Sequence, residues 1–162
     1  MIAGGQAQPI RYRAGFEVTL PAGTQVLEDK KESLQAALSA PGRPALPALA
    51  AEVHPRLSVR VEPEVTAERL EGWVGVALIE QADRLLGARL VDEEPASLAG
   101  HPGRRTMTRH LADGLLSVTL EQWWVAAGGH GTVLSVSLPS VDVAEHASLI
   151  EGIAASLVPA AG

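Results

Sequence analysis

Apolar and polar residues alternate along several segments of the chain, which is the pattern of strands with one buried face. Two such segments, 12–20 and 48–62, lie in the first half of the sequence. Their apolar residues occupy every second position: Phe16, Val18, Leu20, Leu57, Val59 and Val61. Because neighbouring side chains of a strand point to opposite faces, each segment is expected to bury this set and to expose the residues between.

The second half of the chain contains consecutive strand-like segments that are separated by glycine, proline and aspartate. These segments are Arg89–Asp92, Arg104–His110, Leu116–Ala126 and Thr132–Leu138. Short turns between successive strands favour hairpins, so this half is predicted to form an antiparallel meander.

A long amphipathic helix is predicted over Ala67–Leu86 because its apolar residues recur at helical spacing. Thr66 is the expected N-cap, and Gly87 is the expected stop. Gly72 and Gly75 lower the stability of a helix, so we expect this helix to pack closely against another backbone at these two positions.

Two further helices are expected. The last one begins at Asp142 and ends before Pro159, with a buried apolar stripe along its length. A short helix is expected within Glu28–Ala40, where Leu34 and Leu38 have helical spacing beside a charged run.

Each amphipathic helix needs a surface on which to bury its apolar stripe, and the strands provide one. The predicted fold class is therefore α+β, with a twisted antiparallel sheet flanked by helices. A single domain is expected over residues 12–158, with a disordered N-terminal tail at 1–11 and a short C-terminal tail at 159–162.

The alternation also predicts which face of the sheet is buried. If Val118, Leu120 and Trp124 share the apolar face of the other strands, the opposite face carries mostly serine, threonine and single charges, with Trp123 among them. Such a face can be solvated, can be covered by a helix or loop, or can bind a partner. The residues expected to bind a partner there are Trp123, Thr119, Glu121, Thr106, Thr108 and Arg60.

Composition narrows the classes of function. The net charge of −6 argues against a nucleic-acid partner, because phosphate binding needs a clustered basic surface. The absence of cysteine excludes disulfides, thiolate catalysis and cysteine-based zinc sites. The start of the chain does not have the pattern of a secretory signal, and no apolar run is long enough for a membrane span, so a cytoplasmic protein is expected; a mature secreted form would look the same.

Motifs of catalysis are not found. The histidines include no pair with metal-ligand spacing, and the closest group, His101, His130 and Asp113, is spread over separate turns. No serine lies in a GxSxG elbow, and the glycine-rich turn 128–131 lacks the ending of a phosphate loop. We therefore expect no catalytic residue, no metal site, no cofactor and no enzyme activity.

Several stretches of sequence resemble those of a known family. They are "FEVTLPAG", "LSVRVEP", "LAGHPGRRTMTRHLADGLLSVTLEQWWVAAGGHGTVLSVSLP" and "IEGIAASL", in this order within about residues 14–158. The chain resembles the PsbP-like superfamily, and within it the bacterial DcrB, LpqN and EagR-type proteins. The resemblance implies an α/β/α sandwich around a twisted antiparallel sheet, and proteins that bind other proteins instead of catalysing.

The EagR-type relatives are similar to intracellular chaperones that shield apolar segments of toxin effectors, often as dimers. The resemblance and the polar face together predict a non-enzymatic protein-binding domain, as an adaptor or chaperone for an exported or toxin-type partner. A secreted effector is the expected partner, with a homodimer as a further expectation. The alternative is a small-ligand carrier with a pocket between sheet and helices, near Trp73 and Trp124.

Overall fold

A seven-stranded antiparallel sheet forms the centre of the protein, with the strand order β3-β4-β5-β9-β8-β7-β6. The computed structural model describes all residues outside 1–7, 12–15, 31–32, 39–54, 113–115 and 160–162. The strands of this sheet are β3 (Gln25–Lys30), β4 (Ser33–Ala37), β5 (Arg56–Pro63), β6 (Arg89–Leu98), β7 (His101–Ala112), β8 (Leu116–Ala127) and β9 (His130–Pro139). The predicted meander of the second half is confirmed as β6 to β9.

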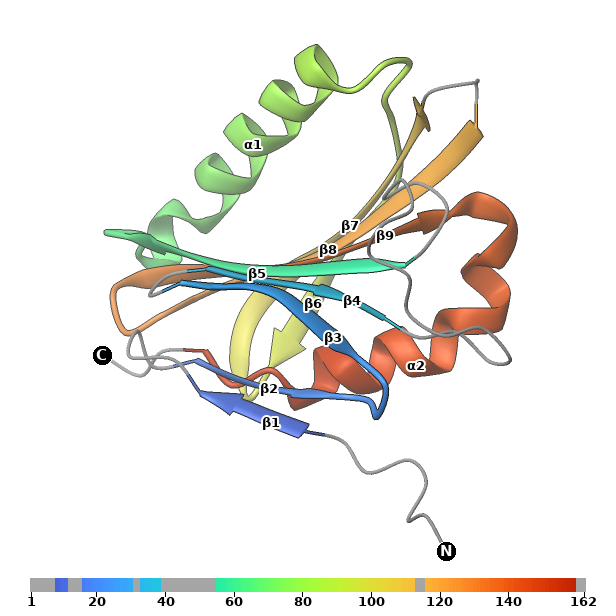
Figure 1. Ribbon diagram of the computed structural model, residues 1–162. Coiled ribbons are helices and arrows are strands. Elements are labelled where there is room, and N and C mark those ends of the chain that lie inside the picture. The colour runs from blue at the N-terminus through green and yellow to red at the C-terminus, as the bar shows by residue number, and fades with distance from the viewer. Residues whose placement is uncertain (1–7, 12–15, 31–32, 39–54, 113–115, 160–162) are drawn as a thin grey trace, which may run out of the picture.

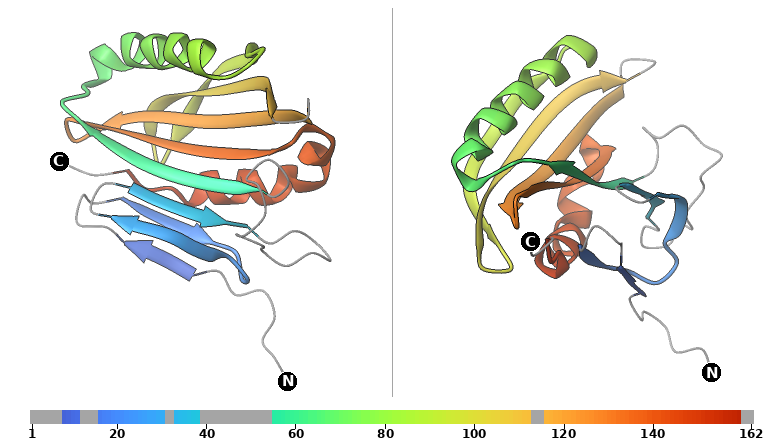
Figure 2. Two further views of the ribbon diagram at one scale, coloured as in Figure 1. Left: turned by 45° about the horizontal axis from the view of Figure 1, so that its top comes forward. Right: turned by 90° about the vertical axis from the view of Figure 1, so that its left-hand side faces the viewer.

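The two α-helices that the structure describes lie on opposite faces of this sheet. Figure 1 shows α1 (Leu70–Arg84) above the sheet and α2 (Val143–Ser156) below it, and the views of Figure 2 agree. A short 3₁₀ turn precedes each helix, at Ala67–Arg69 and at Ser140–Asp142. The α+β class and the α/β/α sandwich are therefore confirmed. Neither helix is long and apolar enough to cross a membrane.

A small second sheet lies on the α2 side of the large one (Figure 1). It consists of β1 (Gln8–Arg11) and β2 (Glu17–Leu20), paired antiparallel. Two backbone hydrogen bonds of 2.8 Å join Glu17 to Val158, just after α2. β1 occupies part of the segment for which the sequence predicts a disordered tail, while residues 1–7 and 160–162 of the predicted tails lie outside the described residues.

The buried apolar residues form one cluster on each face of the large sheet. The cluster on the α2 side is the larger, and it joins β2, β4, β5, β8 and β9 to the helix. The cluster on the α1 side consists of Val65, Leu70, Val74, Trp124, Ala126 and Val133, with Trp73, Ala77 and Leu78 packed against it. The interior strand β8 therefore carries buried apolar side chains on both of its faces.

The prediction of a short helix within Glu28–Ala40 is wrong. This region forms the hairpin of β3 and β4, in which Leu34 pairs with Val59 of β5. Leu34, Ala36 and Leu38 are all buried at every second position, so the same apolar residues fit a strand period as well as a helical one. Pairing with β5 decides in favour of the strand, because it buries the apolar set in the α2-side core.

The glycines of α1 do not have the predicted role. A Cβ atom added at Gly72 or Gly75 would meet no atom within 4 Å, so no second backbone packs against the helix there. The helix ends before the expected stop, since Leu85 is its extended C-cap; Gly87, with a φ of 64° in the left-handed conformation that glycine adopts readily, belongs to the turn that follows.

Candidate functional site

The register of β8 places its two tryptophans on opposite faces of the sheet. Trp123 pairs with Leu134 and Trp124 pairs with Val133. Trp123 therefore belongs to the α2-side core, where it is 5% exposed, and Trp124 lies under α1 with no exposed area. The prediction that Trp123 is an exposed anchor on a polar face is wrong.

The error arises because β8 is buried on both faces. Its two sets of alternate residues each mix apolar and polar side chains, so alternation alone does not show which set points toward α2. The predicted partner-binding residues are consequently divided between the faces. Thr119, Glu121 and Trp123 lie on the α2 face, whereas Thr106, Thr108 and Arg60 lie on the α1 face.

Most of these predicted residues are inside the protein. The hydroxyl of Thr106 accepts a 2.9 Å hydrogen bond from Trp124 Nε1, and both Thr106 and Thr108 are buried. Thr119 Oγ1 lies 2.8 Å from Ser140 Oγ, and Glu121 forms an ion pair with Arg105. Of the six predicted residues, Arg60 is the one whose side chain is largely accessible, at 56% exposure.

The ion pair of Arg105 and Glu121 is structural. Arg105 Nη2 lies 2.8 Å from Glu121 Oε2, its Nη1 reaches Asp92 and Glu94 on β6, and the guanidinium carbon lies 6.0 Å from the ring centre of Trp123. Burial raises the pKa of Glu121, and the hydrogen bond from Arg105 opposes this effect without cancelling it. Burial lowers the pKa of Arg105, but its acidic partners outweigh burial and raise it. Arg105 thus links β7 to β8 through Glu121 and to the edge strand β6 through Asp92 and Glu94.

A row of polar side chains crosses the open part of the α1 face. Gln35 of β4 pairs with Ser58 of β5, Ser58 pairs with Ser135 of β9, and Ser135 pairs with Gln122 of β8. Directly paired residues of neighbouring strands point to the same face, and strands lie about 4.8 Å apart, so the four side chains form one line of roughly 14 Å. Gln35 is exposed, Ser58 and Ser135 are half-buried, and Gln122 is buried under the helix.

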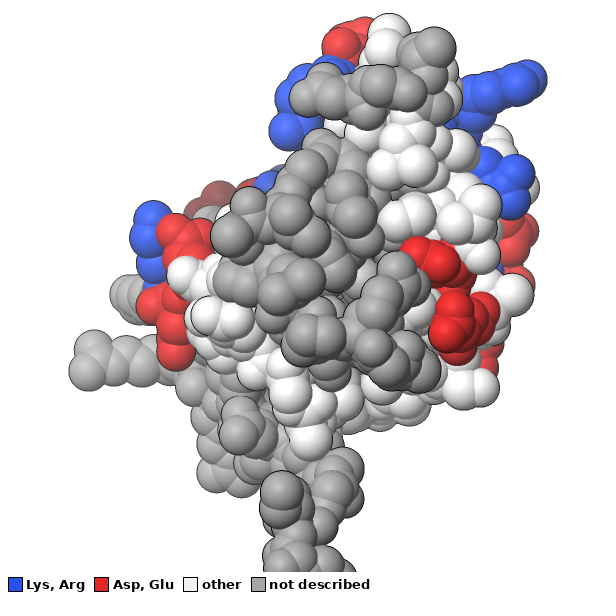
Figure 3. Space-filling model, turned by 45° about the vertical axis from the view of Figure 1, so that its right-hand side comes forward, with Lys and Arg blue, Asp and Glu red and all other residues white. Residues whose placement is uncertain are grey.

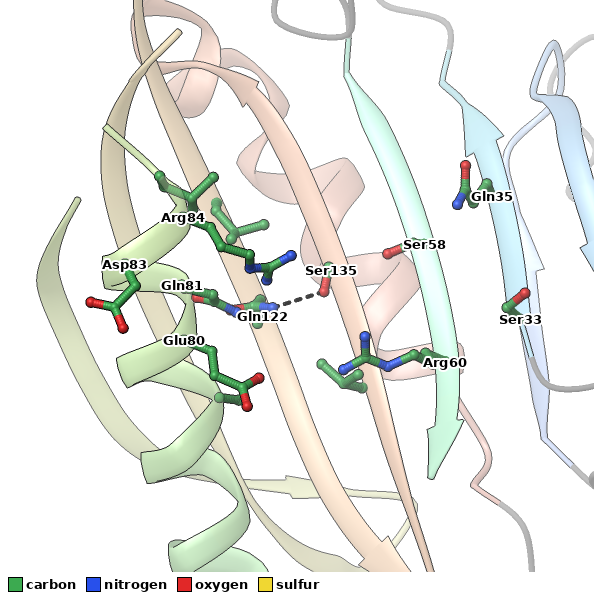
Figure 4. Close-up of a pocket in the computed structure, with 14 residues that line it drawn as sticks. Ser33, Gln35, Ser58, Arg60, Glu80, Gln81, Asp83, Arg84, Gln122 and Ser135 are labelled. Atoms are coloured by element: carbon green, nitrogen blue, oxygen red, sulfur yellow. Dashed lines mark hydrogen bonds between the residues drawn. The ribbon is translucent and has the colours of Figure 1, made fainter. Parts of the chain in front are cut away.

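A groove lies between this polar row and the C-terminal half of α1 (Figure 4). Its volume of about 670 Å³ is within the usual range of ligand pockets. The strand side is lined by Ser33, Gln35, Ser58, Arg60, Leu120, Gln122, Val133 and Ser135, and the helix side by Ala77, Glu80, Gln81, Asp83, Arg84 and Leu85. Ten of these fourteen residues carry a hydrogen-bonding side chain, and four are apolar.

A chain of two hydrogen bonds runs from α1 across the floor of the groove. Gln81 Nε2 donates to Gln122 Oε1 at 2.9 Å, and Gln122 Nε2 donates to Ser135 Oγ at 3.0 Å. Because the oxygen of Ser135 accepts this bond, its hydroxyl hydrogen is free to turn toward the groove. The buried amides of Gln81 and Gln122 therefore set both the position of the helix and the orientation of Ser135.

Charged side chains enter the groove from both walls. Figure 4 shows the guanidinium groups of Arg60 and Arg84 directed toward each other from β5 and α1, with Ser135 between them. Glu80 also points toward the strands, whereas Asp83 points away from them (Figure 4). Arg60 Nε lies 3.5 Å from a carboxylate oxygen of Glu62.

The expected pocket near Trp73 and Trp124 is filled. The two rings meet edge to face, with centroids 5.2 Å apart and planes at 87°. The groove lies instead along the other half of α1, and Gln81, not Trp73, forms its inner wall. An apolar hollow of about 490 Å³ beside Trp73 lies at the outer side of the helix, where Val65, Gly72 and Val76 line it.

The sequence contains a signal for this side of the sheet. Polar residues alternate with apolar ones in both β5 and β9, in "LSVRV" and "LSVSL", and these two strands are neighbours. Gln35, Gln122 and Arg84 were missed because their place beside Ser58 and Ser135 depends on the order of strands. Within the described residues, no group of three or more histidine, aspartate or glutamate side chains could hold a metal ion; Asp113, named with His101 and His130, lies outside them.

No family model and no curated protein matches the chain. Among solved structures, it is similar to the Ran-binding protein Mog1p of Saccharomyces cerevisiae, with 12% identity and a TM-score of 0.63 over 98% of this chain and 97% of the other. It is also similar to the cyanobacterial PsbP of Synechocystis, with 13% identity and a TM-score of 0.62 over 98% and 94%.

A third similar structure is LpqN of Mycobacterium tuberculosis, a protein involved in cell envelope biogenesis. Its identity is 15% and its TM-score 0.60, over 95% of this chain and 90% of the other. These similarities confirm the predicted PsbP-like fold and the predicted resemblance to LpqN. The resemblance to DcrB and to the EagR type stays a prediction.

Proposed function

We propose that this chain is a non-enzymatic protein-binding domain, and that it holds a polypeptide segment of its partner in the groove between α1 and the polar row. The observation that carries this proposal is the row itself. A continuous line of hydrogen-bonding groups leads across the α1 face from β4 to the C-terminal half of α1. It consists of Gln35, Ser58, Ser135 and Gln122.

The chemistry of the row suits a peptide backbone. An extended segment presents N–H and C=O groups that need partners, and side-chain amides and hydroxyls can both donate and accept hydrogen bonds. Ser58 and Ser135 are half-buried, so only part of their surface remains to be removed from water when a segment binds. Pockets with a few convergent polar groups are the usual form of binding sites.

The comparisons support the class of partner. The printed description of Mog1p is a Ran-binding protein, so a protein of the same fold has a protein partner. Fold alone does not fix function, and the groove is the feature of this chain that gives the proposal its specific site. The net charge of −6 disfavours a nucleic-acid partner, and on the face that Figure 3 shows the basic side chains form small separate groups.

The finer role is proposed from the same surface. An adaptor or chaperone in the cytoplasm would hold a polar stretch of an exported or toxin-type protein in this groove, and two copies could act together as a homodimer. Most of the lining residues carry hydrogen-bonding side chains, so we expect the groove to suit a segment with polar side chains. Shielding of a long apolar segment would need an apolar cradle, which these lining residues do not form.

A small polar ligand is the second candidate. The volume of about 670 Å³ supports it, because a metabolite-sized molecule fits such a cavity. The two candidates differ in what stays bound. A carrier retains a small molecule through mild purification, which native mass spectrometry detects as an added mass.

The experiment blocks the groove and compares binding. Ser135→Trp places an indole on the groove floor, and Ser97→Trp adds the same group to an exposed position of β6 as the matched control. Peptides selected by display on the native protein should bind Ser97→Trp as they bind the native protein, and should not bind Ser135→Trp. Equal binding by the folded Ser135→Trp variant, or failure to select any peptide, would contradict the proposal. An added mass that only Ser135→Trp loses would favour the carrier.

A further inference from the structure

The groove contains more hydrogen-bond donors than acceptors. Arg60 reaches it from β5 and Arg84 from α1, and a guanidinium group donates through five N–H bonds and accepts none. Ser135 adds a hydroxyl hydrogen that is free to donate, because its oxygen already accepts from Gln122. A ligand that satisfies these groups must supply acceptor oxygens.

The positions of the two arginines favour a single acceptor group between them. They point toward each other across the groove from opposite walls, with Ser135 on the floor between (Figure 4). Arg84 forms no ion pair among the residues that the structure describes, and Arg60 has one long contact, from Nε to Glu62, which leaves its two terminal nitrogens available. Planar guanidinium groups bind carboxylates and related oxyanions with paired hydrogen bonds.

The net charge of the side chains that point into the groove favours a singly charged oxyanion over a doubly charged one. Two arginines and Glu80 point into it, while Asp83 points away and Glu62, which contacts Arg60 Nε, is not among the lining residues, so the charge directed into the groove is +2 − 1 = +1. A singly charged carboxylate balances this charge. A doubly charged phosphate would leave an excess of negative charge beside the Glu80 carboxylate.

We propose that the groove recognises an acidic side chain of the bound polypeptide, whose carboxylate lies between Arg60 and Arg84 above Ser135. This inference rests on the proposed function, because it names the residue type within the segment that the groove holds. The polar row forms hydrogen bonds with the backbone of the segment, and the two arginines select an acidic residue at one position of its sequence. Glu80 sets the limit of one negative charge.

The test uses blocked, fluorescently labelled hexapeptide pools of serine and valine that carry glutamate, glutamine or lysine at one fixed position. The native protein should bind the glutamate pool about tenfold more tightly than the glutamine pool, which is the effect of a charge-assisted hydrogen-bond pair, and the lysine pool most weakly. The Arg60→Gln/Arg84→Gln double variant should lose this preference. Arg89→Gln, an exposed change on β6, is the matched control and should keep it.

Each outcome decides one claim. Equal binding of the glutamate and glutamine pools overturns the carboxylate site but leaves a peptide-binding groove. A preference that persists in the double variant also overturns it, because the carboxylate then binds elsewhere. If no pool binds while free glutarate binds in an arginine-dependent manner, the carboxylate site stands and the polypeptide function fails; if neither binds, both are wrong.

Discussion

The ring of Trp73 on α1 meets the ring of Trp124 on β8 edge to face, at 5.2 Å between centroids. Trp124 is fully buried and donates its Nε1 hydrogen to Thr106, so it offers a fixed surface to the helix. This contact holds the N-terminal half of α1 on the sheet, and the Gln81–Gln122 hydrogen bond holds its C-terminal half. Between them they fix the wall of the groove.

Replacement of Trp73 by alanine should loosen α1. We expect a loss of about 2–3 kcal/mol of unfolding free energy, somewhat less than for a fully buried tryptophan, because Trp73 is only half-buried. Val76→Ala changes an exposed residue of the same helix and should cost less than about 0.5 kcal/mol. Urea unfolding measures both. Equal losses in the two variants would show that the ring contact does not hold the helix.

Gly131 should not tolerate a side chain, because of its closeness to Trp73. A Cβ atom at this position would lie 2.8 Å from Trp73 Cη2 and 3.0 Å from Val65 Cβ. Gly131→Ala is expected to lower the unfolding free energy by about 1–3 kcal/mol, as overpacking does. In a Trp73→Ala background the same change should cost much less, since its main obstacle is gone; an unchanged cost in the double variant would contradict this explanation.

The glycines of α1 should respond in the opposite way. Gly72 and Gly75 have open space where a Cβ atom would lie. Because alanine favours the helix more than glycine does, Gly72→Ala should raise the unfolding free energy by up to about 1 kcal/mol. Thermal unfolding checks this directly. A decrease would mean that the helix needs a bare backbone at Gly72, for instance against a partner.

The raised pKa of Glu121 predicts a pH dependence of stability. Burial raises the pKa of Glu121 in the folded protein above its ordinary value of 4.5, so the folded state keeps this proton to a higher pH than the unfolded chain does. Its contribution to stability is therefore largest at acid pH and declines as the pH rises from about 4.5 through the raised value.

The measurement compares the native protein with Glu121→Gln, whose side chain does not titrate. The unfolding free energy of the native protein minus that of the variant should fall as the pH is raised from about 4.5 through the raised pKa of Glu121, and should become level above it. A difference that grows over this range would mean that the ion pair with Arg105 outweighs burial, and would reverse the assigned direction of the pKa.

Much of the fold follows from local patterns in the sequence. The meander β6 to β9 was predictable because each strand is bounded by turn residues, and α1 and α2 because their apolar stripes have helical spacing. The hairpin β3–β4 was not, since Leu34, Ala36 and Leu38 fit either period and the decision comes from pairing with β5.

The site was less predictable than the fold. Arg60 was identified, and so was the polar character of β5 and β9, but the groove joins Ser58 to Ser135 and Gln35 to residues of α1 and β8 that are far away in sequence. Local alternation shows that a strand has a polar side, and only the strand order shows which polar sides meet. On β8 both faces are buried, so the alternation of residues could not predict which face of the sheet Trp123 lies on.

The central claim is that the partner lies in the groove between α1 and the polar row, and amide chemical-shift mapping with a selected peptide tests it most directly. We expect the largest shifts at Ser58, Ser135, Gln122 and Arg84, with the edge strand β6 and helix α2 unchanged. Shifts confined to β6 or to α2, with the signals of Ser58 and Ser135 unmoved, would contradict the account.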